Sequence, residues 1–130
     1  MPISSEIKQQ VFDTLKQAVL MYCPPLVNNK NTETAFEVIG NTPTPYGSKK
    51  VIVPGMYFSS AVIRKDSVVF YFFPTYMNEN EFKDLAPKTW KCLKGKTCFH
   101  FKKLEDLDVK EINALMKKGV AAYKRMGWIK

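Results

Sequence analysis

The chain has 130 residues, 45% of them hydrophobic and 25% charged, which suits one compact domain over residues 1–130 and excludes intrinsic disorder. Lys and Arg number 20 against 12 Asp and Glu, so the formal net charge is +8 and anionic partners are favoured over cationic ones. No apolar run approaches the roughly 20 residues that a membrane-spanning helix needs, which argues against a membrane protein.

The first part of the chain predicts one helix and a short strand. Apolar residues recur at helical spacing over residues 7–22, after a serine that can cap the helix, and Pro24 ends it. We expect turns over residues 28–32 and 40–50, the second because it holds two Pro and two Gly in eleven positions. The segment between them, residues 35–39, is a candidate strand.

The middle of the chain predicts a β-hairpin. Residues 56–63 (MYFSSAVI) and 68–73 (VVFYFF) are rich in β-branched and aromatic side chains, and only four residues separate them. Because the second run shows no polar alternation, we expect it to lie centrally in the sheet with both faces covered.

Short helical pieces and a further strand are predicted next. Residues 79–94 favour helix, with Pro87 in a first turn and Gly95 as the stop. Residues 97–101 alternate, so Cys98 and His100 face one way while Phe99 and Phe101 face the core.

The last helix has the clearest signature. Asp108 can cap it, Glu111 is positioned to complete a capping box, and an apolar stripe follows as far as Tyr123. Gly119 at the edge of that stripe suggests a close backbone contact. The element order predicts an α+β fold, with a central antiparallel sheet flanked by N-terminal and C-terminal helices.

Positive charge is concentrated near the C-terminus. Residues 81–130 hold thirteen Lys and Arg against six Asp and Glu, whereas residues 1–80 hold seven against six. A basic surface attracts anions, and cations interleaved with aromatic residues suit single-stranded nucleic acid. A solvated lysine surface without a ligand is the alternative. The predicted anion- or partner-binding residues are Lys88, Lys91, Lys94, Lys96, Lys102 and Lys103.

Cys98 and His100 are candidate metal ligands because they project from the same face of one strand. His100 is the only histidine and no CxxC motif occurs, so a third ligand must come from Cys92 or from the acids of residues 105–111. A buried Cys beside a hydrogen-bonded His is the structural alternative. The chain lacks phosphate-loop, serine-hydrolase and zinc-protease motifs, so we expect a non-enzymatic protein without a cofactor.

Three cysteines form a poor disulfide framework, and the N-terminal residues MPISSEIKQQ lack a basic segment followed by an apolar one. Both features predict a cytoplasmic protein with reduced thiols. The sequence leaves a monomer and a homodimer equally open.

Two stretches resemble the YdhG-like family of small bacterial domains. Residues 56–76 form a hairpin whose second strand ends in an aromatic–Pro corner, and residues 93–124 lead from a Lys-Gly pair through an alternating strand to the final helix. The resemblance covers roughly residues 45–128 and implies an α+β fold with a central antiparallel sheet. The family is similar in outline to frataxin, and some members are described as iron chaperones, which implies an iron or metal carrier as an alternative function. That function depends on an acidic surface, whereas this chain is basic, so no iron-binding residue is carried over.

Overall fold

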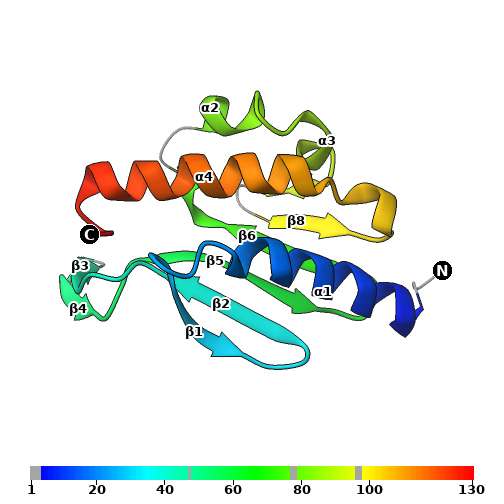
Figure 1. Cartoon of the computed structure of the whole chain (residues 1–130), viewed down its shortest axis with the longest axis horizontal. Coiled ribbons are helices and arrows are strands. Elements are labelled where there is room, and N and C mark those ends of the chain that lie inside the picture. The colour runs from blue at the N-terminus through cyan, green and yellow to red at the C-terminus, as the bar shows by residue number, and fades with distance from the viewer. Residues whose placement is uncertain (1–3, 47, 77–78, 96–97) are drawn as a thin grey trace.

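The structure, a computed structural model, describes residues 4–46, 48–76, 79–95 and 98–130. It has an α+β fold, in which a six-stranded antiparallel sheet carries its helices on one face (Figure 1). The helices are α1 (Ser5–Leu20), α2 (Glu79–Lys83), α3 (Pro87–Trp90) and α4 (Val109–Met126), with 3-10 turns η1 (Phe73–Tyr76) and η2 (Leu104–Asp106). The sheet strands are β1 (Val27–Asn31), β2 (Ala35–Ile39), β5 (Tyr57–Ile63), β6 (Val68–Phe72), β7 (Leu93–Lys94) and β8 (Cys98–Phe101). Strands β3 (Thr44–Tyr46) and β4 (Val51–Val53) form a separate hairpin.

The strand order in the sheet is β1-β2-β5-β6-β8-β7, and every neighbouring pair is antiparallel. The predicted hairpin is confirmed as β5 and β6, the central pair. The prediction is wrong at three strands. Strands β1 and β3 lie in segments predicted to be turn or loop, and β7 lies in a segment predicted to be helical. Gly95, with φ +85°, belongs to the turn between β7 and β8 and does not end a helix.

All four helices are attached to the same face of the sheet by aromatic side chains. This face forms the core, and it includes Phe99 and Phe101, both fully buried as predicted. The second face of β6 carries Val69, which is buried, and Tyr71, which is half-buried, so this central strand is largely covered on both faces as predicted, although the ring contacts to the helices lie on the first face. The helix-to-sheet ring pairs, with centroid distances, are Phe12–Phe36 (5.6 Å), Phe82–Phe72 (5.4 Å), Trp90–Phe99 (5.0 Å) and Tyr123–Phe58 (4.8 Å).

The last helix begins as predicted and departs from the prediction in one contact. The Asp108 side chain caps it by accepting hydrogen bonds from the backbone N–H groups of residues 110 and 111. Glu111 does not complete a capping box, because its carboxylate reaches the first turn of α3 instead. Gly119 makes the predicted close contact, since a Cβ atom there would lie 2.7 Å from Cζ of Phe58.

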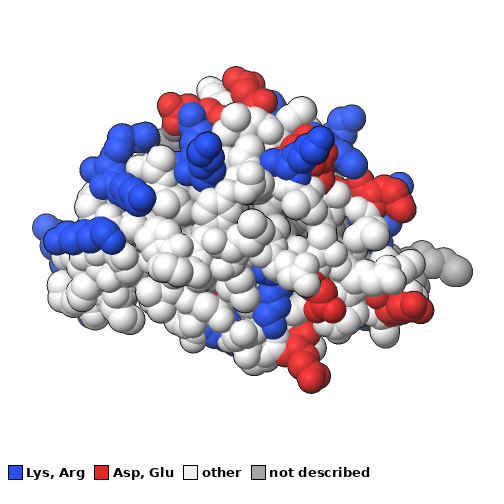
Figure 2. All heavy atoms as spheres, viewed as in Figure 1, with Lys and Arg blue, Asp and Glu red and all other residues white. Residues whose placement is uncertain are grey.

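The helix side of the molecule is unevenly charged. Figure 2 shows Lys and Arg gathered where α4 ends, acidic groups along the edges and a largely uncharged centre. Within the described residues, no helix combines the length and the apolar character needed to cross a membrane.

Candidate anion-binding site on the open sheet face

The sheet face opposite the helices, called the open face below, carries a row of mainly polar side chains. Paired residues of antiparallel strands project to the same side, so the register alone places these side chains together. Strands β7 and β8 contribute the C-terminal part of the row. The row crosses all six strands in the order Lys30, Glu37, Ser60, Tyr71, Cys98 and Lys94.

A hollow of about 510 Å³ opens on this face at the β8 side. Val69 and Tyr71 of β6 line it together with Ser67 and His100. Among the described residues, the charged side chains around it are four cations and one carboxylate, so its balance of formal charge is strongly positive. These residues are Arg64, Lys65, Lys94, Lys102 and Asp66. We call this hollow the basic pocket.

The turn between β5 and β6 supplies two of the cations. The Arg64 N–H donates a hydrogen bond of 2.8 Å to the Ser67 carbonyl, which closes the turn. From α1, the Lys8 ammonium donates to the carbonyl oxygens of Arg64 and Lys65 at 3.1 and 3.0 Å. The backbone of the turn is thus fixed while both cationic side chains are exposed. Because Val68 pairs with Phe101 of β8, the turn lies beside the residue that follows this strand.

The other two cations are Lys94, in β7, and Lys102, directly after β8. The Asp106 carboxylate accepts hydrogen bonds from the backbone N–H groups of Lys102 (3.0 Å) and Lys103 (3.3 Å), which fixes the chain after β8. Lys94 lies opposite Cys98, across the hairpin that β7 forms with β8. Two segments distant in sequence, the turn after β5 and the β7–β8 hairpin, therefore bring their cations to one pocket.

His100 reports the positive potential of the pocket. Its Nδ1 lies 3.4 Å from Oγ of Ser67. Burial lowers the pKa of His100, and the neighbouring charges of Lys94 and Lys102 lower it further. The neutral imidazole is therefore favoured, and a bound anion would relieve the repulsion that disfavours its protonated form.

The predicted lysines that the structure describes do not form one surface. Lys94 and Lys102 line the basic pocket, whereas Lys88 and Lys91 belong to α3 and its C-cap, on the helix side. Lys103 is exposed without lining the pocket. Lys96 lies outside the described residues.

Sequence reasoning missed Arg64 and Lys65, which it treated only as the separator between two strands. The available signal was a turn with two basic residues between two segments that clearly predict strands. It becomes informative once β8 is paired with β6, because that pairing brings the turn next to Lys102.

Cys98 and His100 do lie on the same face of β8, as predicted. Cys92 packs against the core, and burial, followed by the charge of Asp106, raises the pKa of its thiol, which disfavours the thiolate that binds metals. Nowhere among the described residues do three His, Cys, Asp or Glu side chains gather in a way that could hold a metal ion. Cys98 and His100 therefore stay predicted metal ligands, and the described residues offer no third ligand beside them.

Comparisons with protein-family models, curated proteins and solved structures find no match for this chain. The resemblance to the YdhG-like family therefore stays a prediction.

Proposed function

We propose that this protein is a non-enzymatic, cytoplasmic binding protein for a small phosphorylated ligand, which it holds in the basic pocket. The main support is the convergence of Arg64, Lys65, Lys94 and Lys102 on one hollow from separate parts of the chain. A lysine surface that only promotes solubility does not require such convergence. An odd set of three cysteines fits the reducing compartment included in the proposal.

The chemistry of the lining suits a phosphate group. The guanidinium of Arg64 can donate two parallel hydrogen bonds to phosphate oxygens, while the lysines add point charges. Ser67, His100 and Tyr71 offer neutral polar groups at the same hollow. A volume of about 510 Å³ lies within the range of roughly 300–1,000 Å³ that is usual for small-molecule sites.

Binding is favoured over catalysis by the electrostatics of His100. Ser67 and His100 are arranged as a nucleophile and a base, but their 3.4 Å separation is long for a hydrogen bond. The two neighbouring lysines make the imidazole a weaker base, the opposite of what activating a serine requires. The same lysines are well suited to hold an anion.

The proposal is tested by isothermal titration of the protein with inorganic pyrophosphate. The double variant Lys94→Gln/Lys102→Gln should lose at least about tenfold in affinity, since each charge-assisted contact contributes of the order of 1 kcal/mol or more. The matched control Lys88→Gln/Lys91→Gln removes the same net charge outside the pocket and should change affinity less than about twofold. Equal losses in both variants, or no binding of pyrophosphate at about 10 mM, would refute the proposal.

The same variants separate the alternatives predicted from sequence. Salt-sensitive binding of a single-stranded oligonucleotide that the pocket variant abolishes, in a protein that ignores pyrophosphate, would replace the proposal with nucleic-acid binding. Stoichiometric iron or zinc in the purified protein, lost in Cys98→Ser, would replace it with a metal carrier.

A further inference from the structure

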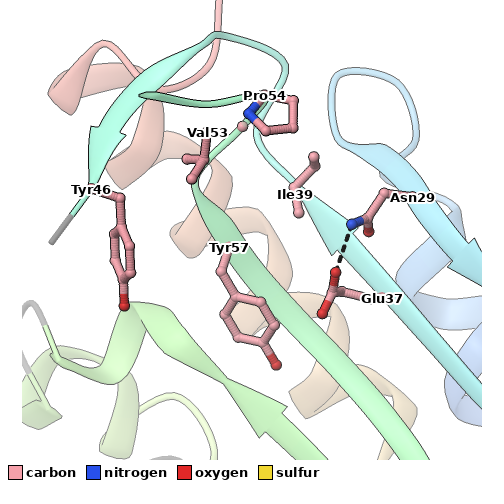
Figure 3. Close-up of a pocket in the computed structure, with 8 residues that line it drawn as sticks. Asn29, Glu37, Ile39, Tyr46, Val53, Pro54 and Tyr57 are labelled. Carbon is pink, nitrogen blue, oxygen red and sulfur yellow. Dashed lines mark hydrogen bonds between the residues drawn. The ribbon is translucent and has the colours of Figure 1, made fainter. Parts of the chain in front are cut away.

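A second hollow, of about 370 Å³, opens at the opposite end of the open face (Figure 3). Strands β1, β2 and β5 and the β3–β4 hairpin line it, and it shares no lining residue with the basic pocket. Tyr46, Tyr57 and Glu37 give the hollow its chemical character, and we call it the tyrosine pocket.

Glu37 brings negative charge to this pocket. The Asn29 side-chain amide donates a hydrogen bond of 2.6 Å to one of its carboxylate oxygens, which fixes the half-buried carboxylate (Figure 3). No Lys or Arg of the described chain lines the hollow; Lys30 is the cross-strand neighbour of Glu37 but lies outside the lining. In a chain with 20 basic and 12 acidic residues, a pocket lined by a carboxylate and no cation differs sharply from its surroundings.

Tyr57 is held rigidly at the pocket. A register shift between Val38 and Ile39 puts it opposite Ile39 on the open face. Its hydroxyl shares a 2.5 Å hydrogen bond with Ser60, and its ring packs edge-on against Phe73 at 5.8 Å between centroids. Burial raises the pKa of Tyr57 to about 12, so the ring carries a neutral phenol at physiological pH.

Tyr46 adds a second aromatic ring from β3. Its side chain is 49% exposed, so much of the ring is accessible from solvent. In the view of Figure 3, the Tyr57 ring lies between the Tyr46 ring and the Glu37 carboxylate. Apolar walls complete the hollow, formed by Ile39 and Val53.

We infer that the tyrosine pocket binds an alkylated ammonium group, such as the trimethylammonium of a choline-like molecule. The faces of Tyr46 and Tyr57 attract cations, and Glu37 supplies the opposite charge. Ile39 and Val53 offer apolar contacts to the alkyl groups of such a cation, whereas a primary ammonium cannot satisfy its N–H donors against these two side chains.

The ammonium group and the proposed phosphorylated ligand occupy separate sites. The two hollows share no lining residue among the described residues, and Glu37 on β2 lies three inter-strand spacings, about 14 Å, from His100 on β8. Because different residues carry the charge at the two sites, each proposal is tested by variants of its own.

Titration with choline chloride, followed by calorimetry, tests the inference. A ligand of this size should bind with a dissociation constant of about 1 mM. Glu37→Gln should weaken binding about tenfold, and Tyr46→Leu should also weaken it because an apolar side chain without a ring replaces the tyrosine. The matched control Glu33→Gln changes an exposed carboxylate just after β1 and should leave the affinity unchanged.

The neutral carbon analogue of choline, with a quaternary carbon in place of the nitrogen, separates charge recognition from apolar contact. It should bind at least about tenfold more weakly than choline. The inference is overturned if both compounds bind alike, if Glu37→Gln behaves like Glu33→Gln, or if choline does not bind at about 20 mM. Pyrophosphate affinity measured on Glu37→Gln should equal that of the unmodified protein, so this test is independent of the proposed function.

Discussion

Helix α3 begins without a capping side chain of its own, because its N-cap residue Ala86 is apolar and fully buried. Glu111 of α4 caps it from outside. One carboxylate oxygen accepts hydrogen bonds from the backbone N–H and the hydroxyl of Thr89, both at 2.7 Å, and the other accepts from the N–H of Lys88 at 3.2 Å. We predict that Glu111→Ala loosens α3 from α4 and destabilises the protein.

The size of this destabilisation depends on how deeply the hydrogen-bond donors that Glu111 satisfies are buried. Thr89 is fully buried, so its two donors lose their partner where water has little access, at a cost of about 1–3 kcal/mol each when wholly unsatisfied. Glu111 is half-exposed and the N–H of Lys88 can rehydrate, which reduces the total. Since measured cap replacements cost about 0.5–2 kcal/mol, we expect Glu111→Ala to lower the free energy of unfolding by about 2–3 kcal/mol. Glu111→Gln keeps one acceptor oxygen and should cost about 1 kcal/mol.

Urea unfolding measures these differences by circular dichroism and by fluorescence of Trp90, which adjoins Thr89. Glu105→Ala is the matched control, because Glu105 is an exposed carboxylate in η2; its cost should stay below about 0.5 kcal/mol. A double-mutant cycle with Thr89→Val should show coupling above about 0.5 kcal/mol. If Glu111→Ala costs no more than Glu105→Ala, the assignment of Glu111 as the cap of α3 is wrong.

Two predictions concern ionisation and packing. His100 should titrate below its ordinary pKa of about 6.5 in nuclear magnetic resonance spectra, and Lys94→Gln/Lys102→Gln should raise that pKa; no change would contradict the assigned cause. The pKa of His100 is lower in the folded protein than in the unfolded chain, where it is about 6.5. The free energy of unfolding should therefore rise with pH between these two pKa values. Below the folded-state pKa the full cost of protonating His100 in the folded protein remains. Gly119→Ala should destabilise by about 1 kcal/mol in urea unfolding although alanine favours helix, because its Cβ would lie 2.7 Å from the buried Phe58 ring; a stabilised variant would contradict this contact.

Strands buried on one face were predictable, and exposed edge strands were not. The aromatic and β-branched runs of β5 and β6 define these strands locally. In contrast, β1 has the sequence VNNKN, with four exposed residues and one half-buried. Its pairing with β2 determines its conformation, and the sequence of β1 has no alternation of apolar and polar residues that would predict this pairing.

The candidate site was predictable only in part, because it also depends on strand pairing between distant segments. Lys94 and Lys102 were found because the basic C-terminal section is visible in the composition. Lys88 is close to Lys94 in sequence, yet it lies on the helix side because α3 packs on the core face of the sheet through Trp90. Arg64 and Lys65 are distant in sequence and join the pocket through the pairing of β6 with β8, a non-local contact that one sequence does not reveal.

The geometry of the open face also limits what it can do chemically. Its half-buried carboxylate, Glu37, is on β2, and its imidazole, His100, is on β8, so three inter-strand spacings of about 14 Å in all separate them. An acid and a base that share one reaction must both come within hydrogen-bond reach of the reacting atoms. These two groups cannot act on one bond of a small substrate. The same separation gives each proposal its own end of the face, an anion beside Lys94 and Lys102 and a cation beside Glu37.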